Sequence, residues 1–300
     1  MQKPFDPKVF QLGYVTIETP DLARAAAHWA ETMGLVETAR GHEGELFLSV
    51  GYEHHNLVLR ESTGKAIGNL GFQLKPGTDL AAFLKEAEEY GIGGRIKSDS
   101  QPGLGALVEL DGPGGLTLQF YTDIEAPAPG FSGKGVAPLR LGHVAVINSE
   151  GRKLMKFFED FLGFWFTDTI EGIANFYTCN RDHHVVNFIE APENRFHHIA
   201  FELKDTSAHA MAADLLRARG VKQEWGPARH GAGHNLAGYH MDPDRVLIEL
   251  YTEMDVFIPE LNMCEARPWH EHYPMRPRDW KMSELNAWGA DFVYELGRAE

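Results

Sequence analysis

The sequence predicts an α+β fold of two similar domains, each made of two βαβββ modules that form an open barrel with the helices outside. Three observations indicate this: the two halves repeat each other, apolar residues alternate in short strands, and other apolar stripes have helical spacing. The clearest repeated segments are LGYVTIETPDLARAAAHWAETMGL, from Leu12, and LGHVAVINSEGRKLMKFFEDFLGF, from Leu141. Repetition on this scale determines the architecture before any single element is assigned.

Each repeated segment opens with an alternating strand and continues as an amphipathic helix. A glycine follows each helix, Gly34 in the first copy and Gly163 in the second, and predicts a left-handed cap at the end of the helix. The helix of the second copy carries one apolar stripe, made of Leu154, Phe157, Phe158, Phe161 and Leu162.

The remainder of each half also repeats. GFQLK near Phe72 mirrors AFELK near Phe201, and a second helix is expected after each, over about 78–90 and 206–219. LTLQFYT then mirrors VLIELYT. One βαβββ module cannot cover both faces of its sheet, whereas two side by side can curl around a concave pocket.

These repeats divide the chain into four predicted parts. Residues 1–122 form an N-terminal domain without a metal, and 123–140, rich in Pro and Gly, form a linker. Residues 141–255 form the C-terminal domain, which we expect to hold the active site. The tail, 256–300, has no counterpart in the repeat and is a candidate cover for the cavity.

Composition excludes several function classes. The net charge of −15 argues against nucleic acid and anionic membranes as partners, because no basic patch is available to meet phosphate. Cys179 and Cys264 are too far apart for a zinc–thiolate motif, and two cysteines make no disulfide framework. The first residues lack the apolar run of a signal peptide and no window is long enough to span a bilayer, so we expect a cytoplasmic protein.

The repeat isolates a candidate metal site in the second half. Alternation places two histidines and one glutamate, on three separate strands, on the concave face. A carboxylate among apolar neighbours is costly unless it is paired or binds a metal. Two imidazoles and one carboxylate on one face suit non-haem Fe(II), and Mn(II) would accept the same ligands. The aligned residues of the two halves are His143 and Tyr14, His198 and Asn69, and Glu249 and Gln119.

Because Tyr, Asn and Gln cannot form the same charged site, we expect one metal in the second half and none in the first. The alternative is that His143 and His198 are satisfied interior histidines and that Glu249 pairs with an arginine.

The segments GHVAV, FHHIAFEL and IELYT, in that order, resemble the type I extradiol ring-cleaving dioxygenases of the vicinal oxygen chelate superfamily. The resemblance covers most of the chain. It implies a two-domain repeat with a catalytic C-terminal half, and His143, His198 and Glu249 as the Fe(II) ligands. It also implies a catechol and O2 as substrates, with the ring opened beside the diol, in the degradation of aromatic compounds.

The resemblance further implies three catalytic residues. His183, in the sequence DHH, matches the acid/base histidine of the family. His230 and Tyr239 match the histidine and tyrosine that flank the substrate oxygens.

The adjacent histidine pairs need separate interpretations. Strand alternation predicts that His184 and His197 face away from the site and serve packing or hydrogen bonding. The first half has its own pair in EHHNLVL, with His54 aligned to His183, although no metal is expected there. Part of the role of such a pair is therefore structural.

Two departures from the resemblance bear on the substrate. Homoprotocatechuate-cleaving members carry an arginine where this chain has Trp225, and an asparagine where it has Ala145. Both changes disfavour a carboxylated substrate, and Trp225 favours a neutral alkyl- or aryl-substituted catechol. The segment RPRDW resembles the closing segment of that subgroup, which makes Arg278 either an anion-binding residue or a surface salt-bridge partner.

Other functions on the same scaffold remain open. A hydroquinone-cleaving dioxygenase is the nearest alternative. Glyoxalase-like enzymes usually assemble their metal site differently, and a non-catalytic small-molecule-binding or resistance protein needs no set of three metal ligands. We further expect a homo-oligomer.

Overall fold

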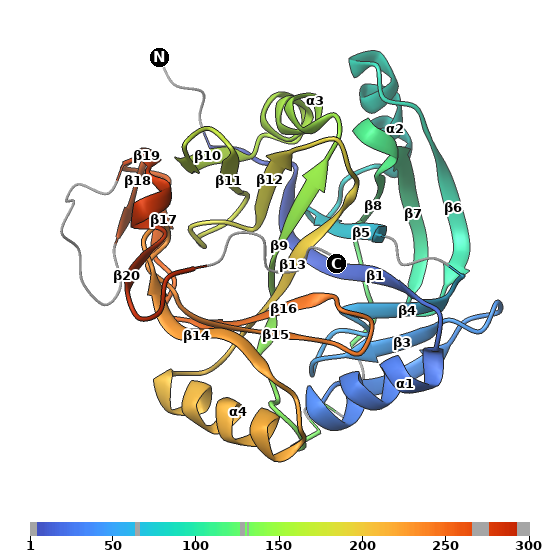
Figure 1. Ribbon diagram of the computed structural model, residues 1–300. Coiled ribbons are helices and arrows are strands. Elements are labelled where there is room, and N and C mark those ends of the chain that lie inside the picture. The colour runs from blue at the N-terminus through green and yellow to red at the C-terminus, as the bar shows by residue number, and fades with distance from the viewer. Residues whose placement is uncertain (1–4, 64–66, 127–129, 131, 266–275, 293–300) are drawn as a thin grey trace. The chain divides into compact units, whose positions relative to one another are not determined.

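The computed structural model describes residues 5–63, 67–126, 130, 132–265 and 276–292. The chain divides into two compact units, each of which is described separately (Figure 1). The N-terminal unit comprises Lys8–Leu141, and the C-terminal unit begins at Gly142 and includes the described residues 5–7.

The N-terminal unit contains the βαβββ module twice. Its first module runs from β1 to β4 and its second from β5 to β8. The elements are β1 (Val9–Thr19), α1 (Leu22–Ala27), a π-helical turn (His28–Thr32), β2 (Val36–Arg40), β3 (Leu46–Ser49), β4 (Leu57–Glu61), β5 (Ile67–Leu74), α2 (Leu80–Tyr90), β6 (Gly94–Gln101), β7 (Leu104–Asp111), a 3-10 turn (Pro113–Gly115) and β8 (Thr117–Tyr121).

The C-terminal unit contains the same two modules and then additional short strands. The elements are β9 (Arg140–Asn148), α3 (Gly151–Lys156), a π-helical turn (Phe157–Phe161), β10 (Trp165–Ile170), β11 (Ala174–Thr178), β12 (Val186–Glu190), β13 (Arg195–Glu202), α4 (Thr206–Ala218), β14 (Gln223–His230), β15 (Leu236–Met241), β16 (Leu247–Thr252), β17 (Val256–Ile258), β18 (Met263–Glu265), β19 (Asp279–Trp280), a 3-10 turn (Met282–Glu284) and β20 (Asn286–Trp288).

Each unit builds one large curled sheet, and the two large sheets share the same strand order; the C-terminal unit also has a two-stranded sheet, β17-β18. Over the described residues, the N-terminal sheet runs β2-β3-β4-β1-β5-β8-β7-β6. The C-terminal sheet runs β10-β11-β12-β9-β13-β16-β15-β14, with β19 added at one edge and β20 at the other. In both sheets the first strand of each module pairs in parallel with the last strand of that module. The predicted fold class is therefore confirmed.

The strand register confirms the alignment between the halves. Gly71 pairs with Gln119 across β5 and β8, and Ala200 pairs with Glu249 across β13 and β16. Gln119 and Glu249 thus occupy equivalent positions in the two sheets.

The predicted helix ends are also confirmed. Gly34 and Gly163 have φ of +86° and +76°, the left-handed conformation that a glycine adopts without strain. The last turn before each glycine widens into a π-helical turn, so that the N–H of Met33 donates to the carbonyl of His28 (3.0 Å) and that of Leu162 to Phe157 (3.2 Å).

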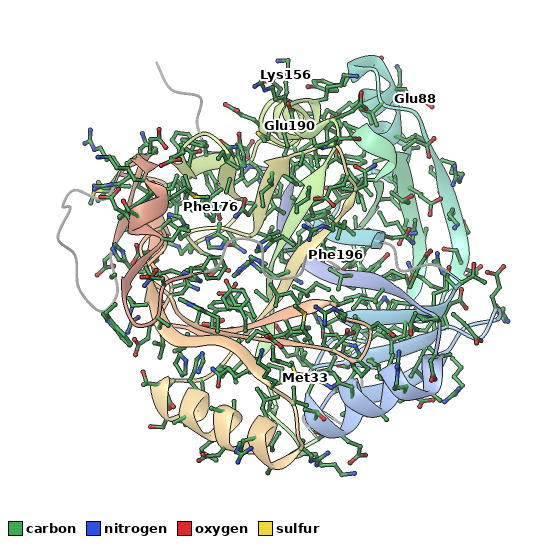
Figure 2. The ribbon with its side chains drawn as sticks, viewed as in Figure 1. Met33, Glu88, Lys156, Phe176, Glu190 and Phe196 are labelled. Atoms are coloured by element: carbon green, nitrogen blue, oxygen red, sulfur yellow. The ribbon has the colours of Figure 1, made fainter. Side chains whose placement is uncertain are left out.

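The helices bury their apolar faces against the sheets. In the C-terminal unit the ring of Phe158 packs on Phe188 of β12, with centroids 4.7 Å apart. Burial of a side chain of this size contributes about 1.5–3 kcal/mol. Charged side chains such as Lys156 point outwards, whereas Phe176 lies inside the unit (Figure 2). No helix in the described part of the chain has the length and apolar content needed to cross a membrane.

The unit boundary lies later than the predicted start of the linker. Described residues within 123–140 are tied to the N-terminal unit, because Val136 donates its N–H to the carbonyl of Thr32 (2.8 Å) and Ala137 to that of Met33 (2.9 Å). The described part of the tail belongs to the C-terminal unit.

Candidate metal centre

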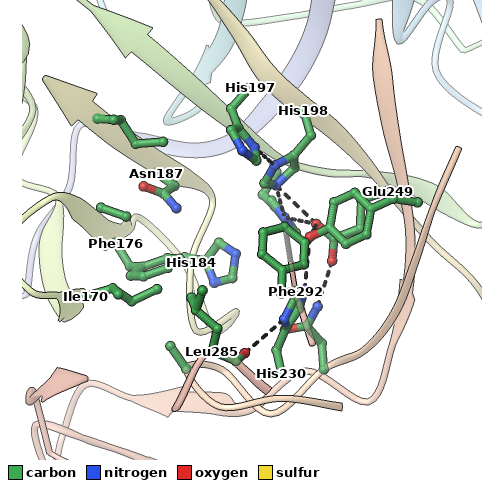
Figure 3. A pocket seen from close by; sticks show the side chains of 16 residues that line it. Ile170, Phe176, His184, Asn187, His197, His198, His230, Glu249, Leu285 and Phe292 are labelled. Carbon is green, nitrogen blue, oxygen red and sulfur yellow. Dashed lines mark hydrogen bonds and ion pairs between the residues drawn. The ribbon is translucent and has the colours of Figure 1, made fainter. Parts of the chain in front are cut away.

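Three neighbouring strands bring two histidines and one glutamate together in the wall of a pocket (Figure 3). Nε2 of His143, on β9, lies 3.1 Å from Oε2 of Glu249, on β16. Nε2 of His198, on β13, lies 3.1 Å from the same oxygen and 3.3 Å from Nε2 of His143. All three side chains are buried.

The spacing of these donor atoms fits a single divalent cation. An ion about 2.1 Å from three mutually perpendicular ligands holds the ligand atoms about 3 Å apart. Three donors on one side of the ion leave its opposite side open to other ligands. The arrangement is that of the two-histidine, one-carboxylate site, which suits Fe(II) and also accepts Mn(II).

Electrostatics favours the protonation states that bind metal. Burial opposes ionisation of Glu249, but the imidazoles of His143 and His198 outweigh it and hold the pKa of the carboxyl well below its usual range. Burial lowers the pKa of His143, against the opposing charge of Glu249, and so favours the neutral imidazole. A carboxylate and neutral imidazoles are the forms in which these side chains bind a metal.

Two neighbouring side chains orient the carboxylate. Asn235 donates from Nδ2 to Oε1 of Glu249 (2.7 Å), and Tyr239 donates its hydroxyl to Oε2 (2.8 Å). Glu249 therefore contacts the two histidines, an amide and a phenol, and no arginine of the described residues pairs with it as the alternative interpretation required. Asn235 was not predicted, because it follows His234, whose φ of +49° interrupts the strand periodicity between β14 and β15.

The predicted pair His230 and Tyr239 lies at one side of the site. Nε2 of His230 is 2.9 Å from the Tyr239 hydroxyl, and its Nδ1 is 3.2 Å from the carbonyl of Leu285. Because a carbonyl only accepts, Nδ1 of His230 carries the hydrogen. Burial lowers the pKa of His230, and burial together with the charge of Glu249 raises the pKa of Tyr239 well above its ordinary value.

The geometry of the pair His183–His184 differs from the prediction. His184 lines the pocket, with its ring centroid 4.2 Å from that of His143, whereas His183 is not a lining residue. Nε2 of His183 instead lies 3.0 Å from Oδ2 of the buried Asp168. Both histidines precede β12 in an irregular segment, where strand alternation does not apply. His197 was also expected to face away, but it borders the pocket, with its Nδ1 2.7 Å from Nδ1 of His198.

The remaining pocket wall is largely apolar. The space enclosed, with its open mouth included, is about 530 Å³. Leu285 and Phe292 come from the predicted tail, so the tail does contribute to the wall. No lysine or arginine lines the pocket in the described part of the chain. The apolar lining residues are Ile170, Ala174, Phe176, Ile189, Ala232, Leu285 and Phe292.

One further polar residue of the wall was not predicted. Asn187, on β12, is 5% exposed and borders the pocket, and Oδ1 of its amide has no hydrogen-bond partner among the described residues. Periodicity marks its position as inward-facing, but gives no signal that an amide there is functional.

The two predicted substrate residues lie outside the pocket wall. Trp225 stacks on His230, with ring centroids 5.0 Å apart, and donates its indole N–H to the carbonyl of Ala290 (2.9 Å). It therefore supports a lining residue from behind. Arg278 donates its backbone N–H to Oδ1 of Asp168 (2.9 Å), and its guanidinium lies over the ring of Trp280, 5.2 Å from the ring centroid. This placement does not fit an anion-binding role in the pocket.

Comparison with known proteins agrees with this geometry. Residues 140–250 match the model of the Glyoxalase/Bleomycin resistance protein/Dioxygenase superfamily. The chain is 27% identical over 255 residues to the metapyrocatechase of Pseudomonas sp. (strain CF600), covering 78% of this chain and 83% of that protein. It is 25% identical over 309 residues to the manganese-dependent 2,3-dihydroxybiphenyl 1,2-dioxygenase of Geobacillus genomosp. 3, covering 94% and 96%.

A solved structure with the same fold is homoprotocatechuate 2,3-dioxygenase from Arthrobacter globiformis. It superposes with a TM-score of 0.82 at 21% identity, over 98% of this chain and 92% of that one.

Proposed function

We propose that this chain, which belongs to the extradiol dioxygenases of the vicinal oxygen chelate superfamily, opens the ring of a catechol beside its diol with Fe(II) and both atoms of O2. One observation carries the proposal. The donor atoms of His143, His198 and Glu249 converge at one end of a pocket whose other wall is apolar. We assign these three residues as the metal ligands.

Fe(II) bound by these three residues would supply open positions for the two diol oxygens and for O2, and would pass electron density from the ring to oxygen. The remaining chemistry falls to the side chains of the pocket. Mn(II) fits the same donors, as the manganese-dependent relative indicates.

Tyr239 and His230 act on the substrate oxygens from one side. The Tyr239 hydroxyl donates its one hydrogen to Glu249 and lies 2.9 Å from Nε2 of His230, so it can turn that hydrogen to an oxygen that enters beside Glu249. With its proton on Nδ1, His230 presents Nε2 to the phenol and can receive or return a proton there. Stacking of Trp225 on His230 keeps that imidazole in place.

Proton transfer on the other side falls to His184 in this proposal. Its ring borders the pocket next to His143, whereas His183 does not reach the pocket. An imidazole can take a proton from a diol hydroxyl and return it to the product. We therefore give His184 the acid/base role that the resemblance implied for His183. His183 contacts the imidazole of His184 without lining the pocket itself.

The pocket supports a neutral catechol as substrate. Phe176, Ile170 and Leu285 offer an apolar surface for a ring with an alkyl or aryl substituent. No lysine or arginine among the described lining residues is available to pair with a carboxylate. Degradation of aromatic compounds is the corresponding biological role. The expected homo-oligomeric state and cytoplasmic location remain predictions.

The test is anaerobic loading of the protein with Fe(II) or Mn(II), followed by a panel of substrates in air. Neutral 3-substituted catechols should give yellow ring-opened products with consumption of one O2 per ring, and homoprotocatechuate should react more slowly. Hydroquinone in the same panel tests the para-diol alternative. Stoichiometric iron without ring opening of any catechol would refute the proposal.

A further inference from the structure

Three buried side chains form a continuous chain of contacts that ends at the pocket. Nε2 of His183 lies 3.0 Å from Oδ2 of Asp168, and Nδ1 of His183 lies 3.0 Å from Nδ1 of His184. All three residues are at most 4% exposed. Of the three, only His184 lines the pocket.

Asp168 accepts hydrogen bonds from two N–H groups that can only act as donors. The backbone N–H of Arg278 donates to Oδ1 (2.9 Å), and the indole N–H of Trp280 donates to Oδ2 (2.7 Å). A carboxylate that accepts from both sides offers only acceptor atoms to its third neighbour, His183. The hydrogen between Asp168 and His183 therefore belongs to Nε2 of His183.

This hydrogen determines the state of the next imidazole. A neutral His183 with its hydrogen on Nε2 has only a lone pair on Nδ1. The hydrogen shared by the two Nδ1 atoms must then belong to His184, which leaves Nε2 of His184 with a lone pair. The same logic operates wherever a carboxylate selects the tautomer of a catalytic histidine.

We propose that Asp168 and His183 are positioning residues that fix His184 as the Nδ1–H tautomer, with Nε2 left as the acceptor for a substrate proton. The inference rests on the proposed function, because a proton acceptor at this place is useful only if a diol binds beside the metal ligands. It adds two residues to the site that do not themselves touch the pocket.

The N-terminal unit supplies an internal comparison. His54 and His55 form the equivalent pair, with their Nδ1 atoms 2.9 Å apart. Asp168 pairs in register with Phe176 across β10 and β11, and the residue that pairs with Phe47 at the equivalent place in β2 and β3 is Ala39. The histidine pair is therefore common to both sheets, whereas the carboxylate at this position of the C-terminal sheet is replaced by Ala39 in the N-terminal sheet.

The direct test is the tautomer of each histidine, which does not require turnover. Long-range 1H–15N correlation spectra of protein labelled at histidine and loaded with diamagnetic Zn(II) distinguish Nδ1–H from Nε2–H. Assignment would use His183→Asn and His184→Asn. We expect Nε2–H on His183 and Nδ1–H on His184. Nε2–H on His184, or hydrogens on both nitrogens of His183, would overturn the inference whether or not the protein cleaves catechols.

The kinetic test separates positioning from folding. Asp168→Asn should lower kcat about 10–100-fold, with KM and bound iron unchanged. Asp168→Glu should recover part of kcat, because it restores the acceptor. His54→Asn, a change in the equivalent histidine pair of the N-terminal unit, should leave kcat unchanged. A normal kcat in a folded, iron-loaded Asp168→Asn would refute the positioning role even if the tautomers are as expected.

Discussion

In the N-terminal unit the hydroxyl of Tyr14 lies 2.5 Å from Oε1 of Gln119, and in the C-terminal unit Nε2 of His143 lies 3.1 Å from Oε2 of Glu249. The four residues occupy equivalent places in two sheets with the same strand order and register. One pair is a neutral hydrogen bond and the other is a pair of potential metal ligands. The scaffold therefore provides a position, and the side chains alone decide its chemistry.

The residues around the two pairs also differ in charge. Gln119 donates onward to Glu109 (2.7 Å), which also forms ion pairs with Arg95 and Lys97. Burial raises the pKa of Tyr14, so its phenol stays protonated. The carboxylate of Glu109 is thus neutralised by cationic side chains. Glu249 instead lies beside two imidazoles, with which it can bind a metal ion.

The largest expected effect comes from making the C-terminal position resemble its counterpart. Glu249→Gln removes the anionic ligand but keeps the shape of the side chain. We expect iron affinity and turnover to fall on the order of 1,000-fold or more. Metal analysis after dialysis, together with oxygen uptake, measures both quantities.

The reciprocal change is the control for that prediction. Gln119→Glu adds a carboxylate to the N-terminal unit, but Tyr14 and Asn69 remain poor ligands, so one metal per chain should still bind. Full iron occupancy in Glu249→Gln, or a second iron in Gln119→Glu, would contradict the comparison.

Tyr239→Phe tests the hydrogen bond to the substrate oxygen. The variant should retain iron, because Asn235 still holds Oε1 of Glu249, and kcat should fall about 100-fold with the loss of a positioned proton donor. Stopped-flow kinetics with a neutral catechol checks this. Tyr14→Phe, at the metal-free position, should leave kcat unchanged. Equal losses in both variants would point to folding defects rather than to chemistry.

The N-terminal histidine pair predicts a sensitivity to acid. Burial, together with the charge of His54, lowers the pKa of His55 to about 3. The unfolded chain takes up a proton near pH 6.5, whereas the folded chain does not, so stability falls as the pH drops below 6.5. Between pH 7 and pH 5 the loss from His55 should be about 2 kcal/mol.

Hydrogen exchange of the amides of β1 and β5 at both pH values measures this loss. His55→Phe keeps the ring packed against Tyr14 and Phe47 but removes the titrating group. Its stability should depend less on pH by about 2 kcal/mol over the same interval. An identical pH dependence in the variant would show that His55 is not the source.

The smallest effect is expected at Asn187, whose counterpart in the N-terminal sheet is Val58 of β4. Asn187→Leu removes a buried amide from the pocket wall, so KM for alkyl catechols should fall about 3–10-fold. KM for catechols with a hydrogen-bonding ring substituent should rise by a similar factor. Ile189→Leu, in the same wall, controls for shape, and unchanged KM values for both substrate types would remove Asn187 from substrate recognition.

Sequence reasoning predicted the correct face of the sheet where residues lie on regular strands. His143, His198 and Glu249 stand at alternating positions in three strands, so a comparison of the two halves was enough to select them. Alternation predicted the wrong orientation for His184, because a bend before β12 interrupts the strand pattern. The acid/base role of His183 was implied by the resemblance and stays a prediction. Asp168 was within reach, since the same comparison aligns it with Ala39.

Other parts of the site could not be predicted from periodicity. Asn235 lies in the loop between β14 and β15. Trp225 belongs to the same strand as the pocket residue His230, but it packs on that imidazole and does not line the pocket. The contacts of Arg278 depend on how the tail returns to β10, which no repeat in the sequence encodes. Pairing between strands so far apart in sequence depends on tertiary packing and leaves no local pattern in the sequence.

The return of the tail has a consequence for the order of assembly during folding. β19 adds only two residues to the edge of β10, and the indole of Trp280 reaches Asp168 across 112 residues of sequence. So short a strand cannot persist before its partner edge exists, so β19 docks only after β10 and its sheet have formed. A refolding chain should therefore capture iron on its completed sheet first, and gain full activity only when the closing strand docks.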